Sequence, residues 1–298
     1  MNDAAHISVM PAEVLEFLNL PAGGVAVDGT LGMAGHALLM AAKLGPQGHV
    51  IGIDRDKFSL ASAKKRLSSL SLRVDLLQGN FKDINRLLAE VKVESVDGIL
   101  LDLGISSFQL DDPARGFAFK TDSPLDMRMD QSSGLSAADM VNTASEEELA
   151  RIIFEYGEDR FSRRIAKLIV QRRAEERITT TTQLADLVLR ALPKGYQRGR
   201  IHPATRTFQA LRIAVNGELD HLGQALIDCF NALKPGGRLC VISFHSLEDR
   251  IAKNTFKYLA QEGNATVLTK RPLEPSDEEQ ASNPRSRSAK LRAITRNP

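Results

Sequence analysis

Short apolar runs alternate with amphipathic stretches over the first hundred residues. The runs end in polar residues or glycine, and the stretches between them carry apolar residues at the three-to-four spacing of helices. Such runs are typical of strands covered on both faces, and strand–helix alternation predicts a parallel sheet with right-handed crossovers. The expected fold class is α/β, an open, doubly wound sheet. Its predicted strands are 25–27, 49–53, 74–77 and 96–103, and its predicted helices are 35–44, 57–70 and 84–91.

The alternation stops near residue 105 and returns near residue 215. Residues 105–134 show no sustained period, which in a compact domain usually has a functional reason. Helical periodicity then begins at Ser145, where Ser145 and Glu148 form a capping-box pattern. We interpret the middle of the chain as a helical insertion. Further helices are expected at 158–176, at 182–191 and from Pro203 to about Leu233, the last interrupted at 216–217.

The sheet pattern resumes after this insertion. Residues 272–288 are rich in Pro, Ser and charge and are expected to be a loop or partly disordered. Around them, 238–244 predict a strand, 247–259 a helix and 291–295 a last strand. The sequence therefore predicts two domains, a discontinuous sheet domain of residues 1–110 and 213–298 and an insertion of residues 111–212.

Composition narrows the class of protein. With 298 residues, 43% of them hydrophobic and 26% charged, the chain is neither collagen-like nor a disulfide-stapled miniprotein. No apolar run approaches the roughly 20 residues that span a bilayer, and the N-terminus lacks a secretory pattern, so we expect a cytoplasmic protein without a membrane partner. Cys229 and Cys240 lie in apolar stretches and are expected to be buried and reduced. The histidines form no cluster with metal-ligand spacing, and no metal is predicted.

The net charge of +2 conceals an uneven distribution. Residues 151–215 hold fourteen Lys and Arg against six Asp and Glu, and residues 281–298 hold five basic residues and no acid, which leaves −11 for the rest of the chain. Basic patches on an acidic body favour a polyanionic partner, because focused charge steers association. The alternative is that these charged helices are simply solvated.

Polar residues gather at the ends of the predicted strands, where an open α/β sheet binds its ligands. Glycines let backbone N–H groups approach a ligand, and an acid about 20 residues further on can bind ribose hydroxyls. Asp54 lies 22 residues after Gly32. The glycine spacing is G-x-x-G-x-x-G, which is neither the dinucleotide nor the P-loop pattern, so an adenosine ligand without a pyrophosphate, such as S-adenosylmethionine, is favoured. The alternative is a structural turn, with Asp54 capping the next helix. The strand-end residues are Gly29, Gly32, Gly35, Asp54, Asn80, Phe81 and Asp102.

Seven stretches spread over nearly the whole chain resemble the RsmH (MraW) family. They are VDGTLG at 27–32, DGILLDLGISS at 97–107, GFAF at 116–119, PLDMRMD at 124–130, HPATRTFQALR at 202–212, SFHSLEDR at 243–250 and NPRSRS at 283–288. This resemblance implies a class I methyltransferase core with an inserted helical domain. It further implies an enzyme that uses S-adenosylmethionine to methylate cytosine N4 of a cytidine at the decoding centre of 16S rRNA in the small ribosomal subunit. Two departures are Met33-Ala34, where the family has glycine-rich residues, and Phe108, where it has proline.

The resemblance also implies which residues meet the methyl donor. Backbone groups near Gly35 would face the methionine carboxylate, Asp54 the ribose and Phe81 the adenine. With Gly32 from the strand-end pattern, the expected donor-binding residues are Gly32, Ala34, Gly35, His36, Asp54, Phe81, Asp102 and Gln109.

Chemistry at an exocyclic amine requires acceptors for its hydrogens. The lone pair of cytosine N4 is delocalised into the ring, so Asp102 and backbone carbonyls of the 104–107 loop are expected to accept from the amine, and positioning would supply much of the acceleration. Phe108 is expected to stack on an unstacked target base or, alternatively, to pack under its loop. The candidate catalytic residues are Asp102, Ser106, Ser107 and Phe108.

Basic residues of the insertion are the candidate RNA contacts. Arg206 and Arg212 would either join them or pair with Asp126 and Asp130. Two other functions stay open: a methyltransferase acting on a small molecule or a protein, and a nonenzymatic ribosome-assembly factor. The expected phosphate-binding residues are Arg163, Arg164, Lys167, Arg172, Arg173, Arg198 and Arg200.

Overall fold

A computed structural model describes residues 8–193, 196 and 202–298. The chain forms two compact units, a sheet unit of Met1–Gly104 with His221–Pro298 and a helical unit of Ile105–Asp220. The chain passes between the units at 104/105 and 220/221. The domain boundaries predicted from the sequence, 110/111 and 212/213, lie within eight residues of these positions.

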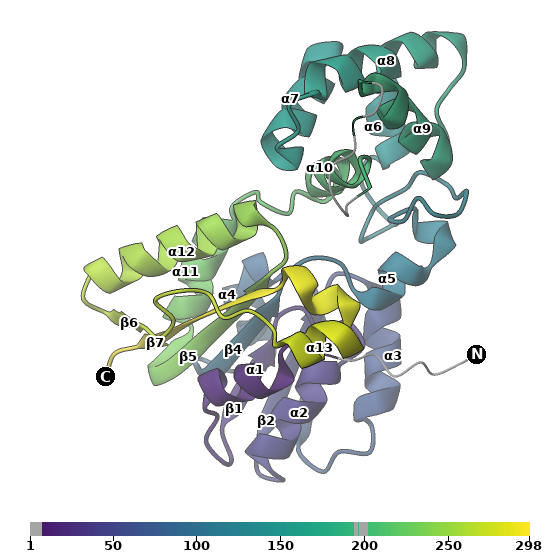
Figure 1. Cartoon of the computed structure of the whole chain (residues 1–298). Helices are drawn as coiled ribbons and strands as arrows, with labels where there is room; N and C mark the ends of the chain where they lie inside the picture. The colour runs from purple at the N-terminus through teal and green to yellow at the C-terminus, as the bar shows by residue number, and fades with distance from the viewer. Residues whose placement is uncertain (1–7, 194–195, 197–201) are drawn as a thin grey trace. The chain divides into compact units, whose positions relative to one another are not determined.

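The sheet unit is built on seven strands in the order β3-β2-β1-β4-β5-β7-β6 (Figure 1). Strands β1 to β5 are parallel, and β7 runs antiparallel to both β5 and β6. The order 3-2-1-4-5 is that of a doubly wound, Rossmann-like sheet, which confirms the predicted fold class. The strands are β1 Val25–Asp28, β2 His49–Asp54, β3 Arg73–Gln78, β4 Val96–Asp102, β5 Leu233–Ser243, β6 Ala265–Val267 and β7 Lys290–Arg296.

Helices cover both faces of this sheet, which explains the continuous apolar runs. Leu100 faces a core shared with α1 and α2, while α11 packs against α4 and α12. Met40 and Leu44 of α2 are fully buried in the same core as Leu100. The helices of the unit are α1 Pro11–Leu18, α2 Gly35–Leu44, α3 Lys57–Leu67, α4 Ile84–Glu90, α11 Leu222–Asn231, α12 Ser246–Gln261 and α13 Asp277–Ser282, with short 3₁₀ turns η1 Phe81–Asp83 and η3 Pro284–Ser288.

The expectation of a loop or partial disorder at 272–288 is wrong for residues 277–288, whereas 272–276 is a loop. The segment contains α13 and η3, and Ser276 caps α13 by accepting from Glu279 N. Long-range contacts stabilise it as well, because Glu279 Oε1 accepts from Met10 N at 2.7 Å and Leu273 bridges to Leu291. Local composition carries no signal for such partners.

The helical unit has a core of its own, formed by Leu149, Ile153, Ile165, Leu184 and Leu211 among others. Capping boxes at Ser136–Asp139 and Thr180–Gln183 begin two of its helices. Among the residues that the structure describes, no helix is long and apolar enough to cross a membrane. The helices are α5 Ser107–Asp111, α6 Ala137–Thr143, α7 Glu146–Gly157, α8 Ser162–Glu175, α9 Thr181–Ala191 and α10 Thr205–Asn216, with the 3₁₀ turn η2 Pro113–Arg115.

Candidate active site

The glycine-rich turn after β1 is tied to both neighbouring strands. Gly32, with φ +49°, donates its N–H to Asp54 Oδ2 at 2.8 Å, and Thr30 Oγ1 accepts from Asp102 N at 2.6 Å. A Cβ at Gly29 would lie 2.5 Å from Leu101 Cδ2 and 3.2 Å from Phe81 Cβ, so Gly29 is closely packed and Phe81 lies beside it. The turn therefore brings the ends of β2 and β4 and the start of η1 around one point.

The residue that precedes the next helix does not cap it. α2 begins after Ala34, which adopts a left-handed φ of +60° and makes no side-chain hydrogen bond to the first turn. Unsatisfied N–H groups at a helix start attract anions. Asp28 already accepts from the N–H of Ala37 in this first turn, and the N–H of Gly35, the first of the helix, is suited to a ligand carboxylate.

Asp54 does not cap the helix after its strand. The cap of α3 is Asp56, which accepts from Phe58 N at 2.9 Å. Asp54 instead accepts one backbone N–H on each oxygen, from Gly32 and from Asp56 at 2.8 Å, and burial raises its pKa to about 6. The backbone N–H of Arg55 also bonds to this carboxyl group, which has about four acceptor positions and so keeps capacity for a ligand hydroxyl.

Asp102 ends β4 in an acidic and enclosed environment. Its Oδ2 lies 3.7 Å from His36 Nε2, and its Oδ1 is buried without a hydrogen-bond partner among the described residues. Burial, followed by the charges of Asp28 and Glu248, raises the pKa of Asp102 to about 8. Burial also raises the pKa of Asp28 to about 7, although Thr30 N donates to it.

Two further residues lie at a strand end and were missed by sequence reasoning. Glu248 is 2% exposed, its Oε2 accepts from Phe244 N at 2.9 Å, and its Oε1 lies 3.3 Å from His245 Nε2. Both residues follow β5, which pairs with β4 through Asp102 and Ile242. Both residues could have been predicted from the sequence, because they directly follow the apolar run of the fifth strand, within the SFHSLEDR motif.

Four of the expected site residues belong to the helical unit. Ser106 caps α5 and accepts from Gln109 N at 3.2 Å, while Gln109 Oε1 accepts from Ser106 N at 3.2 Å. Gln109 is buried, Phe108 is half-buried, and Ser107 opens the helix. Their roles toward donor and base stay predictions.

The expected RNA contacts fall into two groups within α8. Arg163, Arg164 and Lys167 are exposed. Arg172 is paired with Glu176, and Arg173 Nη1 donates to the carbonyls of Val141 at 2.9 Å and Ala144 at 2.7 Å, near the end of α6. Arg198 and Arg200 lie outside the described residues. Of the two arginines with alternative roles, Arg206 donates to Glu158 O at 2.6 Å and Arg212 forms a bidentate pair with Glu218 at 2.7 and 2.8 Å.

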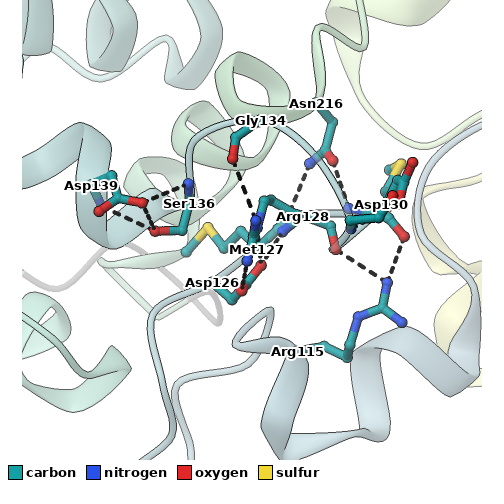
Figure 2. Close-up of polar contacts among 11 residues, drawn as sticks. Arg115, Asp126, Met127, Arg128, Asp130, Gly134, Ser136, Asp139 and Asn216 are labelled. Atoms are coloured by element: carbon teal, nitrogen blue, oxygen red, sulfur yellow. Dashed lines mark hydrogen bonds and ion pairs between the residues drawn. The ribbon is translucent and has the colours of Figure 1, made fainter.

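The PLDMRMD motif forms a clamped loop in the helical unit (Figure 2). Arg115 Nη2 donates to the carbonyls of Arg128 at 3.1 Å and Met129 at 2.7 Å. Asn216 binds the other side, accepting from Met129 N and donating to Met127 O, both at 2.7 Å. These contacts hold Met127 in a left-handed conformation with φ +63°, which is unusual for a residue other than glycine.

The sheet order, the glycine turn and the acid after the second strand define a Rossmann-like methyltransferase. The model of the MraW methylase family matches residues 3–297, and the chain belongs to this family. It is similar to proteins named "Ribosomal RNA small subunit methyltransferase H". The protein from Syntrophotalea carbinolica is 53% identical over 98% of both chains, and that from Deinococcus deserti is 57% identical over 98% of this chain and 93% of the relative. The methyl donor is S-adenosylmethionine, as the sequence predicted.

The strand-end residues fit this donor. The first N–H of α2, at Gly35, suits its carboxylate, and the remaining acceptor capacity of Asp54 suits a ribose hydroxyl. The unpartnered Asp102 Oδ1 offers negative charge to a cation. No basic side chain is ion-paired with Asp28, Asp54 or Asp102 in the described ranges, apart from the His36 contact.

Proposed function

We propose that this protein methylates the N4 amino group of a cytidine in the decoding region of 16S rRNA, with the small ribosomal subunit as its partner in the cytoplasm. The observation that carries the proposal is the identity above 50% with small-subunit rRNA methyltransferases along essentially the full length of both chains. The acidic strand-end site supports it, because it suits a positively charged donor.

The binding roles follow from the contacts of the sheet unit. The N–H groups at Gly35 and His36 bind the methionine carboxylate, Asp54 accepts from the ribose hydroxyls, and Phe81 packs on the adenine. When bound, S-adenosylmethionine supplies an electrophilic methyl group on a positively charged sulphur.

Asp102 has the chemistry required at the amine. In its ionised form it accepts a hydrogen from N4, and carbonyls of the 104–107 loop that follows it in the chain accept the other. This favours a tetrahedral nitrogen whose lone pair can attack, and a fixed line of approach lowers the entropic part of the barrier. Phe108 stacks on the target base once that base is unstacked.

The exposed face of α8 contacts phosphates. Three of the expected phosphate contacts have exposed side chains: Arg163, Arg164 and Lys167. Arg172 and Arg173, in contrast, are bonded to other groups of the protein. Phosphate contacts make the affinity for RNA fall steeply with salt. In a plot of log affinity against log salt concentration, each contact that is removed reduces the slope by about one unit. The double variant Arg163→Ala/Lys167→Ala therefore weakens RNA binding and flattens its salt dependence. Lys253→Ala/Lys257→Ala, an equally spaced exposed pair on α12, is the control.

Methyl-labelled donor identifies the substrate class directly. The protein is incubated with small ribosomal subunits, with naked 16S rRNA and with a small-molecule extract, and labelled RNA is digested to nucleosides. We expect N4-methylcytidine from the ribosomal samples. Label only in the extract would indicate a small-molecule methyltransferase, and binding of subunits without any label would indicate an assembly factor; either result refutes the proposal.

A further inference from the structure

Four buried or half-buried acids converge on the carboxyl ends of neighbouring strands in the sheet unit. Asp28, Asp54 and Asp102 end β1, β2 and β4, and Glu248 follows β5 in the first turn of α12. The groups that face Asp102 are Asp28 from β1, His36 from α2 and Glu248 from α12. Two of these three are acids, and the third is an imidazole at 3.7 Å.

Asp102 differs from the other two strand-end aspartates in how its carboxyl group is supported. Asp54 accepts backbone N–H groups from Gly32, Asp56 and Arg55, and Asp28 accepts those of Thr30 and Ala37. Asp102 uses its own N–H to bind Thr30 Oγ1, but its Oδ1 has no partner among the described residues, although the side chain as a whole is 23% exposed. The fold therefore leaves a negative charge on Asp102 uncompensated.

An uncompensated buried carboxyl group takes up a proton instead of carrying its charge. The pKa of Asp102, raised to about 8, means that the group is largely neutral at pH 7. A cation bound beside it would supply the missing compensation and favour the ionised form, whereas an uncharged ligand of the same shape would not.

We propose that Asp102 is the residue by which this protein distinguishes the positively charged methyl donor from its uncharged demethylated product: it releases a proton when the donor binds and holds that proton when the product is bound. The inference rests on the donor site of the proposed function and is independent of the RNA target. It assigns to Asp102 a role in specificity in addition to contact with the donor.

The same cycle balances the charges of methyl transfer. The bond from sulphur to the methyl carbon breaks, the bond from nitrogen to that carbon forms, and the amine loses one proton. Asp102, ionised while the donor is bound, takes up this proton as the sulphur loses its charge. The product complex then contains a neutral thioether beside a neutral carboxyl group.

The size of the effect follows from the fraction of Asp102 that is already ionised before binding. With a pKa of about 8, that fraction is about 1 in 100 at pH 6 and about one half at pH 8. Because apparent affinity scales with the binding-competent fraction, donor affinity rises with pH over this range, by at most about 50-fold, while product affinity does not follow.

Calorimetric titration without RNA tests this directly. S-adenosylmethionine and S-adenosylhomocysteine are titrated into the protein between pH 6 and pH 9, in pairs of buffers with different heats of ionisation. The slope of the observed binding enthalpy against the buffer's heat of ionisation then gives the number of protons released. The same titrations are made with Asp102→Asn and with a control, Asp75→Asn, which removes an acid of β3 that is paired with Arg73 and His49. The amino group of each ligand titrates in every protein, so the proton from Asp102 is the difference between wild type and Asp102→Asn.

We expect up to one extra proton released by wild type and by Asp75→Asn with the donor, and none with the product. Asp102→Asn loses the extra proton and the pH-dependent preference for donor over product, but keeps its affinity for the product. Equal proton release by wild type and Asp102→Asn, or equal release with both ligands, would overturn the inference. If Asp102→Asn does not fold, equal proton release with donor and product in wild type would still overturn the inference. Failure of the RNA assay would leave this result untouched.

Discussion

Removal of the Asn216 side chain should destabilise the helical unit. Asn216 is 8% exposed and lies in the last turn of α10. Its Oδ1 accepts from Met129 N, and its Nδ2 donates to the carbonyls of Met127 at 2.7 Å and Arg212 at 2.8 Å. The side chain thus bonds to two backbone groups of the clamped loop (Figure 2).

The magnitude follows from the polar groups that Asn216→Ala leaves behind. Met129 N–H and Met127 O lose this partner in a buried setting, and each unsatisfied buried group costs about 1–3 kcal/mol. The positive φ of Met127 adds strain that the clamp no longer offsets. We expect a loss of about 3 kcal/mol in the free energy of unfolding.

The assay is urea unfolding of the full chain, followed by circular dichroism, with the midpoint and slope fitted separately. Asn254→Ala, an exposed position within α12, is the matched control and should change stability by no more than about 0.5 kcal/mol. Asn216→Asp retains an acceptor for Met129 N but turns a carboxylate oxygen toward two carbonyls, so it should be at least as harmful. If Asn216→Ala were as stable as the control, the clamp would contribute nothing and the reasoning would be refuted.

Three further outcomes are expected. Because the pKa of Asp102 is raised in the folded state, Asp102 holds a proton there that the unfolded chain has already lost, so the stability of the protein should fall between about pH 4 and pH 8. Melting temperatures measured across this range should fall less for Asp102→Asn than for wild type. An identical pH profile for the two proteins would contradict this prediction. Arg173→Ala should cost about 2 kcal/mol, because two carbonyls near the end of α6 lose their donor, whereas Lys167→Ala should be neutral in the same urea assay; equal effects would count against the distinction. Burial raises the pKa of both Cys229 and Cys240, so neither thiol should react with a maleimide until the protein unfolds, and labelling of the native chain at the rate of the urea-unfolded chain would show the burial to be wrong.

Much of the fold was readable from local pattern. The predicted helix 35–44 coincides with α2, and the predicted break at 216–217 separates α10 from α11. Apolar runs also located every strand of the parallel part of the sheet. For β1, β2, β4 and β5 the reason is that strands covered on both faces must be apolar at nearly every position, whereas β3 is a half-buried edge strand. β6 and α1 were not expected, and β5 begins at Leu233, five residues before the predicted strand.

The candidate site could be predicted only where the position of a residue in the chain also gives its position in the sheet. Parallel strands end at one edge of the sheet, so Asp54 and Asp102 were predicted together from their places after two strands. Whether Asp54 supports a ligand or caps a helix depended on geometry, and Asp56 proved to be the cap. The division within α8, with Arg173 bonded to α6 and Lys167 exposed, also required the packed structure.

By itself, the sequence determined the strand–helix alternation, the position of the insertion and the residue types at the strand ends, because these depend on neighbours along the chain. Only the tertiary structure decided that 277–288 forms α13 and η3, that β7 runs antiparallel between β5 and β6, and that Asp102 lacks a partner for Oδ1 among the described residues. Those features depend on groups far apart in the chain, such as Met10 N on Glu279, and on how completely water is removed from a side chain. Neither the long-range partners of a residue nor its burial can be read from the residues next to it in the chain.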